Sequence, residues 1–208
     1  MSSGDNNQIS EPAAAARGTQ DTSSKSSPDS VLEPIVPGET PQLPSGLVFV
    51  CVDDDDIARM FAQAMLSQLS VHADSCILGS DVTQVRDVPA LVERLTAVHG
   101  TQRIVVILDQ NLDFDESPET IFGTDLCREL RAKGFDGLVA ILSADDDSAS
   151  QDEFIRSGAN LTVGKSPEDQ LIFPARLAGA FHRLHPAAAA TKASHPVDGW
   201  LPAQRMSK

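Results

Sequence analysis

The sequence predicts an α/β fold: a doubly wound, five-stranded parallel sheet with helices on both faces. The first observation is that short apolar runs alternate along the chain with segments whose apolar residues recur at helical spacing. The second is that the strongest runs have no polar interruption, as is typical of strands buried on both sides. Strands that alternate with helices in this way form a parallel sheet with a helical layer on each face.

Five strands are expected. The strongest candidates are residues 46–52, 104–108 and 138–142, because each is a continuous apolar run. Weaker candidates lie at about residues 76–78 and 161–163.

Five helices are expected to connect and follow these strands. Gly134 is expected to end the third, over residues 124–133, and Pro174 to lie in the first turn of the last. The apolar positions that indicate the other four are Ile57, Met60, Phe61, Ala64 and Met65, then Leu91, Val92, Leu95 and Val98, then Phe154 and Ile155, and finally Leu177, Ala180, Phe181 and Leu184.

Length, composition and charge narrow the possible functions. The chain has 208 residues, which suits one ordinary domain with tails. Its formal net charge of −14 argues against a nucleic-acid surface, which needs clustered Lys and Arg. No apolar run is long enough to span a membrane, and the N-terminus lacks the features of a secretory signal. We therefore expect a cytoplasmic protein that binds neither nucleic acid nor membrane.

Cysteines and histidines give no sign of a metal centre. Cys51, Cys76 and Cys127 are widely spaced, so we expect reduced thiols in or near the core. The five histidines are scattered, and none has a neighbour that suggests a nucleophile or a metal ligand.

The expected domain occupies residues 46–185, between two tails. Residues 1–45 hold six of the 13 prolines and many serines, so they cannot bury enough apolar area to offset their ordering entropy. Residues 186–208 form a similar second tail, and disorder is expected for both. No output domain fits in either tail, so we expect a complete, single-domain protein.

Polar residues follow four of the five expected strands, and they carry the chemistry. Asp53 and Asp54 follow the first strand, Asp109 and Ser143 follow the third and fourth, and Lys165 comes just after the fifth. The carboxyl ends of such strands converge on one crevice. Carboxylate oxygens suit Mg²⁺, which would relieve their mutual repulsion and neutralise charge on an incoming phosphoryl group. A carboxylate can then act as nucleophile and form an aspartyl phosphate.

Five short motifs resemble those of the response-regulator receiver domain, and they occur in the family's order over about 140 residues. The resemblance implies a flavodoxin-like fold with strand order 2-1-3-4-5. The motifs are Val52-Asp-Asp-x₄-Arg59, Leu108-Asp109-x-Asn111, Gly123-x-Asp125-Leu126, Ser143-Ala144 and Gly158-Ala159-x₅-Lys165.

The resemblance implies a role for each matching residue. Asp109 would be the phosphoacceptor. Asp54 would bind Mg²⁺ directly, Asp53 mainly through water, and Asn111 through its backbone carbonyl. The remaining positions bind or accommodate the phosphoryl group: Ser143 as the hydroxyl switch, Ala144 as the small residue beside it, and Lys165 as the partner of the phosphoryl oxygens.

Three features depart from the family pattern. Thr162 replaces the aromatic residue that usually precedes the lysine by three positions, so an aromatic switch is absent. Ser166 separates Lys165 from Pro167, whereas the family places proline directly after the lysine. Residues 113–122 form an acidic insertion that we expect to be a solvated surface loop.

Simpler roles are expected for some charged residues near the site. Asp55 and Asp56 would cap the first helix and stabilise its positive end. Arg59 would be a solvated helix residue. Asn111 and Asp145 occupy the two positions that tune phosphoryl lifetime in the family, and both are short and polar. A lifetime of seconds to minutes is therefore expected.

The resemblance implies a regulatory phosphoacceptor and not an enzyme. It would receive phosphoryl from a sensor histidine kinase or a histidine phosphotransfer protein, and act on a downstream protein through a surface near its last two helices. The alternative is a pseudo-receiver that binds partners without phosphorylation. A phosphohydrolase is disfavoured, because those enzymes usually have a second acid where this chain has Asn111.

Overall fold

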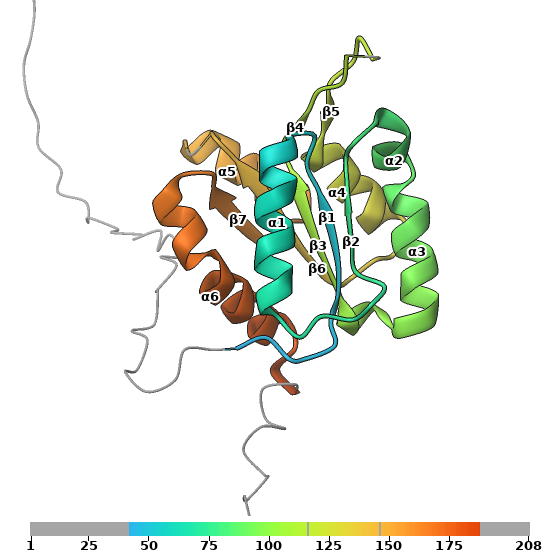
Figure 1. Cartoon of the computed structure of the whole chain (residues 1–208), viewed down its shortest axis with the longest axis vertical. Helices are drawn as coiled ribbons and strands as arrows, with labels where there is room; N and C mark the ends of the chain where they lie inside the picture. The colour runs from blue at the N-terminus through green and yellow to red at the C-terminus, as the bar shows by residue number, and fades with distance from the viewer. Residues whose placement is uncertain (1–41, 116, 146, 188–208) are drawn as a thin grey trace, which may run out of the picture. The chain divides into compact units, whose positions relative to one another are not determined.

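The computed structural model describes residues 42–115, 117–145 and 147–187 (Figure 1). Most of the two segments expected to be disordered, residues 1–45 and 186–208, lies outside these ranges. No helix within the described ranges is both long and apolar enough to cross a membrane. In chain order the elements are β1 (Val48–Val52), α1 (Asp56–Gln68), β2 (Cys76–Leu78), α2 (Val82–Arg86), α3 (Val88–His99), the 3₁₀ turn η1 (Thr101–Arg103), β3 (Ile104–Asp109), β4 (Asn111–Leu112), β5 (Ile121–Phe122), α4 (Gly123–Ala132), β6 (Leu138–Ser143), α5 (Ser148–Arg156), β7 (Leu161–Gly164) and α6 (Pro167–Leu184).

Five strands form one parallel sheet in the order β2-β1-β3-β6-β7. The predicted fold class and strand order are confirmed, because β6 and β7 are the fourth and fifth strands of this sheet. β4 and β5 form a separate antiparallel pair. Helices α1 and α6 pack on one face of the sheet, and α2, α3, α4 and α5 pack on the other.

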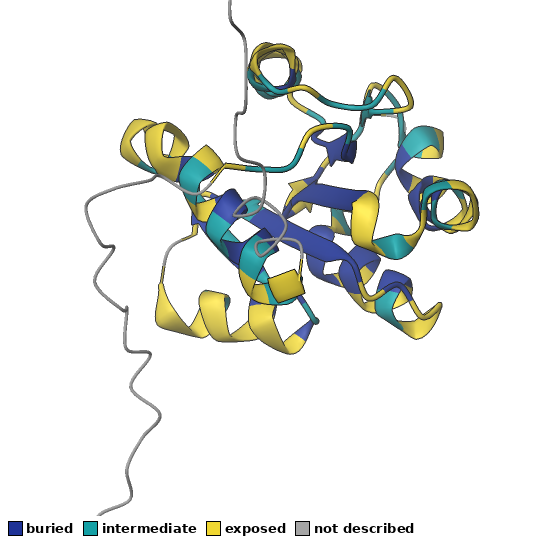
Figure 2. Cartoon of the chain, turned by 90° about the horizontal axis from the view of Figure 1, so that it is seen from below, coloured by how far each residue is buried: buried dark blue, intermediate teal, exposed yellow. Residues whose placement is uncertain are grey.

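β1 shows why the strands had to be continuously apolar. Val48, Val50 and Val52 belong to the core on the α3 side, whereas Phe49 and Cys51 belong to the core on the α1 side. Successive side chains of a strand point to opposite faces, so a central strand must be apolar at every position. Figure 2 shows the buried sheet between helices whose outer surfaces are exposed.

The first helix is confirmed, but its apolar stripe is not a buried face. Ile57, Met60 and Phe61 are 64%, 71% and 60% exposed. Leu66 is the one residue of α1 that is buried. Helical spacing therefore predicted the element correctly, and it did not predict which surface the apolar residues would face.

The expected start of the last helix was wrong. α6 begins at Pro167, and Pro174 lies inside the helix. Ser166 caps it, because its Oγ accepts a hydrogen bond from the Asp169 N–H at 3.1 Å. A Ser cap followed by Pro at the first helical position is a strong start signal, and it outweighs the interior proline.

Helix α2, the turn η1 and the strand pair β4–β5 were not predicted. Asp81 caps α2 by accepting hydrogen bonds from the N–H groups of Thr83 and Gln84. The expected solvated insertion, residues 113–122, is closed at its base by the β4–β5 pair, in which Leu112 is fully buried. Figure 1 shows this hairpin projecting from the end of the sheet.

Candidate functional site

The strand register brings the predicted acidic residues together. Val52 of β1 pairs with Leu108 of β3, so the residues that follow them, Asp53 and Asp109, leave adjacent strands side by side. Asp53 and Asp109 are only 7% and 6% exposed, and Asp54 beside them is half-buried. One carboxylate oxygen from each of the three lies within 4.8 Å of the other two. Such close carboxylates repel one another strongly unless a cation lies among them.

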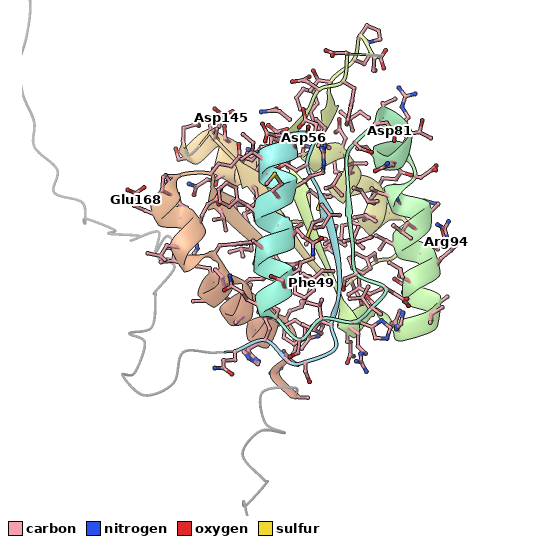
Figure 3. All side chains as sticks on the ribbon, viewed as in Figure 1. Phe49, Asp56, Asp81, Arg94, Asp145 and Glu168 are labelled. Carbon is pink, nitrogen blue, oxygen red and sulfur yellow. The ribbon has the colours of Figure 1, made fainter. Side chains whose placement is uncertain are left out.

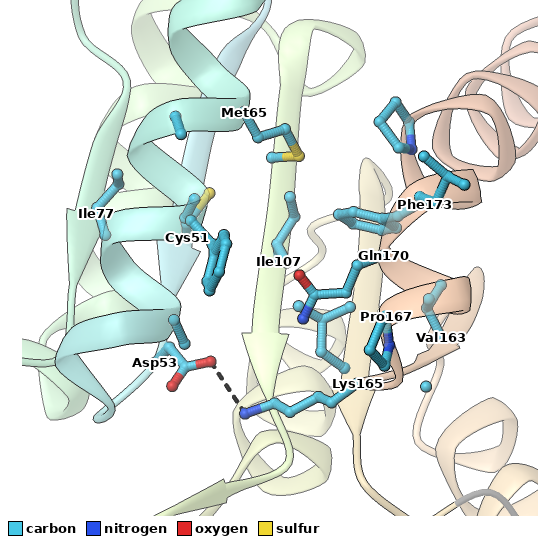
Figure 4. Close-up of a pocket in the computed structure, with 18 of the residues that line it drawn as sticks. Cys51, Asp53, Met65, Ile77, Ile107, Val163, Lys165, Pro167, Gln170 and Phe173 are labelled. Carbon is cyan, nitrogen blue, oxygen red and sulfur yellow. Dashed lines mark hydrogen bonds and ion pairs between the residues drawn. The ribbon is translucent and has the colours of Figure 1, made fainter.

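Lys165 supplies a positive charge to this cluster. Its Nζ lies 2.8 Å from Asp109 Oδ1 and 3.1 Å from Asp53 Oδ2. The close-up in Figure 4 shows the lysine reaching across from the end of β7 to Asp53. The Lys165 N–H also donates to the Ser143 carbonyl at 3.0 Å, which ties the loop after β7 to the end of β6.

Burial has the largest effect on the pKa values of the two buried aspartates of the site. It raises the pKa of Asp109 to about 6, and the hydrogen bond from Lys165 opposes this only in part. Burial also raises the pKa of Asp53. For Lys165 burial acts in the opposite direction, but the hydrogen bonds and charges of Asp109 and Asp53 leave its pKa raised. The site therefore holds excess negative charge that a further cation would stabilise.

Backbone contacts around Asp109 explain a glycine of the third motif. The Gln110 N–H donates to Asp109 Oδ1 at 2.7 Å. Gly123, at the start of α4, packs so closely that any side chain there would collide with the Asp109 carbonyl. Gln110 and Thr124 exchange two hydrogen bonds, at 3.2 and 3.4 Å, that hold α4 against the end of β3.

Arg59 is not the solvated residue that we expected. Its side chain is 17% exposed, and Nη1 donates to the carbonyls of Asp53, Asp54 and Gly79 at 2.8, 2.7 and 2.9 Å. Nη2 pairs with Asp56. The guanidinium thus holds the acidic loop by its backbone and leaves the carboxylates of Asp53 and Asp54 for the site.

The expected cap of the first helix is confirmed, since Asp55 Oδ1 accepts hydrogen bonds from two backbone N–H groups at the start of α1.

The other predicted site residues lie around this centre. Ser143 is buried at the end of β6, and its Oγ accepts a hydrogen bond from the Asp145 N–H at 3.0 Å. Asn111 begins β4 and is exposed. Asp113, which follows β4, donates its N–H to Asp54 Oδ2 at 3.1 Å. The β4–β5 hairpin therefore contacts the acidic cluster. Figure 3 shows further acidic side chains, including Asp56 and Asp145, at this end of the domain.

A groove of about 690 Å³ opens beside the site, between α1 and α6. Phe61 and Met65 line it from α1 and Phe173 from α6, and it reaches Asp53 and Lys165 (Figure 4). The sequence did not predict this groove.

Comparison with solved structures identifies the fold. The signal receiver domain of the putative LuxO repressor protein from Vibrio parahaemolyticus is 18% identical, with 70% of this chain and 97% of that chain covered and a TM-score of 0.52. The receiver domain of Francisella response regulator 1452 is 20% identical, covering 66% of this chain and 98% of that chain with a TM-score of 0.46. No protein-family model and no curated protein matches the sequence. The described residues therefore have the receiver-domain fold, and the function must be argued from the site.

Proposed function

We propose that this chain is a response regulator of the phosphorelay type, in which residues 46–185 accept a phosphoryl group on Asp109. One observation carries the proposal. Asp109 lies nearly buried at the carboxyl edge of the sheet, in contact with Lys165 and close to the carboxylates of Asp53 and Asp54. A nucleophile, a cation for phosphoryl oxygens and ligands for a metal ion are thus within reach of one another.

The donor set fits Mg²⁺. Asp53, Asp54 and Asp109 supply three carboxylates within 4.8 Å of one another, and hard oxygen ligands are those that Mg²⁺ prefers. The backbone carbonyl of Asn111 is proposed as the fourth protein ligand. When bound, the ion would supply positive charge to the carboxylates and to the phosphoryl oxygens.

Each side chain has a definite task in the transfer. Asp109 Oδ1 accepts hydrogen bonds from Lys165 and from the Gln110 N–H, so we assign the attack on phosphorus to the other oxygen, Oδ2. A new O–P bond forms as the P–N bond to the donor histidine breaks, and the imidazole leaves with the bonding electrons and takes up a proton. Lys165 then neutralises a phosphoryl oxygen. The Ser143 hydroxyl would exchange its contact with the Asp145 N–H for a phosphoryl oxygen, which would move the loop after β6.

The partner surface is proposed on α1 and the start of α6. Ile57, Met60 and Phe61 on α1 and Leu171 and Ile172 on α6 are large apolar side chains with exposed surface. Of these, Phe61 and Leu171 line the groove that reaches Asp53 and Lys165. A histidine kinase or phosphotransfer protein that covered them would bring its histidine to the acceptor. The downstream partner would bind near the last two helices, α5 and α6, where it would contact the loop between β6 and α5.

Intact-mass measurement tests the proposal directly. The protein is incubated with acetyl phosphate or phosphoramidate and Mg²⁺, beside an Asp109→Asn variant and an Asp125→Asn variant that removes an exposed carboxylate elsewhere. We expect one added phosphoryl group in the wild type and in Asp125→Asn, dependent on Mg²⁺, and none in Asp109→Asn. No addition, with fluoroberyllate also failing to bind, would favour the pseudo-receiver.

The lifetime of the modified form is a separate prediction. Asn111 and Asp145 are exposed and short, so water can reach the acceptor from their side. We expect the added phosphoryl mass to disappear within seconds to minutes after the donor is removed. A modified fraction that persists for many hours would contradict this prediction.

A further inference from the structure

We propose that His72, Asp74 and His99 form a binding site for one Zn²⁺ ion. His72 and Asp74 lie in the loop that leads into β2, and His99 is the last residue of α3. One ligand atom from each of the three lies within 4.8 Å of the other two. The sequence did not indicate this cluster, because the fold joins His99 to residues that are distant from it in the sequence.

The distances fit tetrahedral coordination. Asp74 Oδ2 lies 2.8 Å from His99 Nε2 and 3.7 Å from His72 Nδ1. Zinc bonds of about 2.0–2.1 Å place tetrahedral ligands about 3.3 Å apart, between these two values. The two imidazoles meet edge to face with centroids 4.6 Å apart. Small side-chain rotations would thus bring all three ligand atoms to zinc distance, with a fourth position for water.

The backbone around the site is held in place. The His72 N–H donates to the Leu47 carbonyl at 2.8 Å, and the Ser75 N–H donates to the His72 carbonyl at 3.0 Å. Ser75 Oγ accepts from the Phe49 N–H at 3.0 Å, which fixes the loop to β1. His99, whose side chain is 12% exposed, lies in the last turn of α3, where the helix dipole favours a cation.

The donor chemistry separates this site from the carboxylate cluster. Two imidazoles and one carboxylate suit Zn²⁺, whereas Mg²⁺ prefers oxygen ligands alone. The three residues lie next to the start of β2, and the carboxylate cluster lies beyond the strand ends at the opposite edge of the sheet. The zinc proposal therefore does not depend on the phosphoryl-transfer proposal.

Binding would exchange two existing contacts for metal bonds. The Asp74 N–H now donates to His72 Nδ1 at 3.1 Å, and His99 Nε2 lies 2.8 Å from Asp74 Oδ2. Because a protonated imidazole cannot bind a metal ion, affinity is expected to fall as the pH falls. Zinc would join the β2 loop to the end of α3, so the full chain should melt at a higher temperature with the ion than without it.

The experiment uses the metal-free full chain with Co²⁺ as a coloured probe for Zn²⁺. We expect one equivalent of Co²⁺ to give the visible absorption of a four-coordinate ion, and one equivalent of Zn²⁺ to abolish it. His72→Gln and His99→Gln should weaken binding at least tenfold. His195→Gln, which changes a histidine outside the described residues, is the matched control and should bind like the wild type.

Asp54→Asn distinguishes the two possible metal sites. If the absorption persists in Asp54→Asn and is lost in His99→Gln, the proposal holds. If His72→Gln and His99→Gln bind like the wild type, or if Asp54→Asn alone abolishes the signal, the metal lies elsewhere and the proposal is overturned. Melting curves of the metal-free variants establish that lost binding does not come from unfolding.

Discussion

Helices α1 and α4 lie on opposite faces of the same sheet, and they are held there by different means. α4 has ten residues, of which five are buried, including Leu126, Cys127 and Leu130. α1 has thirteen residues, of which Leu66 alone is buried. α1 packs on the sheet through Leu66 and the partly buried Ala62 and Met65. It is also fixed at its first turn, where Asp55 caps it and Arg59 binds three backbone carbonyls.

The two faces of the sheet therefore differ in what they contribute to the protein. On the α4 face, apolar burial stabilises the fold and positions the backbone that follows Asp109. On the α1 face, polar contacts fix the helix beside the acidic site, and apolar side chains remain exposed next to a groove. Such exposed apolar residues are typical of a surface that binds another protein.

The largest effect on stability is expected from Leu130→Ala in α4. Leu130 is 1% exposed, and loss of a fully buried leucine typically lowers the free energy of unfolding by about 2–5 kcal/mol. Met60→Ala in α1 is the matched change, and at 71% exposure it should alter that free energy by about 0.5 kcal/mol or less. Urea unfolding of both variants measures the difference. Equal losses would show that α1 is packed as firmly as α4.

Asp109 is the last residue of β3, and Asp109→Asn should stabilise the metal-free protein. Folding raises the pKa of Asp109 to about 6 from an unfolded value of about 3.9, so the charged form is disfavoured in the folded state. The contribution of this group is fully present below about pH 4 and is lost as the pH rises through about 6. Removing the charge should therefore raise the free energy of unfolding by about 1–3 kcal/mol at pH 7.5, and by much less at pH 4.

Thermal or urea unfolding at both pH values, without Mg²⁺, checks this prediction. Asp115→Asn, which changes an exposed carboxylate of the hairpin, is the control and should have little effect at either pH. A destabilised Asp109→Asn variant at pH 7.5 would mean that its ion pair with Lys165 outweighs the effect of burial.

Much of the fold and the acidic site followed from the sequence, because both depend on local features. Strand ends were marked by the change from apolar to charged residues at Asp53 and Asp109. Parallel pairing then placed these ends at one edge of the sheet, so Lys165 could be assigned to the same crevice. None of these steps required knowledge of how helices pack.

The features that the sequence did not predict depend on contacts between distant segments. Arg59 binds the Gly79 carbonyl only because the loop after β2 approaches the end of β1. His72 and His99 meet through the packing of α3 beside the β2 loop, which leaves no periodic pattern. The exposure of Phe61 depends on the separation of α1 from α6. Helical spacing shows that residues share a stripe, and not whether that stripe is covered.

A smaller loss of stability is expected from Arg59→Met, which keeps the aliphatic stem and removes the guanidinium. Three backbone carbonyls would lose a charged donor, so the free energy of unfolding should fall by about 1–2 kcal/mol. Arg156→Met removes an exposed arginine that also donates to a backbone carbonyl, and it should cost about 0.5 kcal/mol or less. Faster amide exchange in the first turn of α1, in Arg59→Met alone, would show that this contact holds the helix.

The smallest effect on stability, and the most informative for function, is expected from Phe61→Ser. Phe61 is 60% exposed, so the free energy of unfolding should change by about 0.5 kcal/mol or less. Phosphorylation by acetyl phosphate should keep its wild-type rate, because a small donor needs no docking surface. Transfer from a phosphohistidine protein that serves the wild type should slow, because the apolar contact beside Asp53 and Lys165 is lost. An unchanged rate with both donors would place the docking surface elsewhere, and the exposed stripe of α1 would then need another explanation.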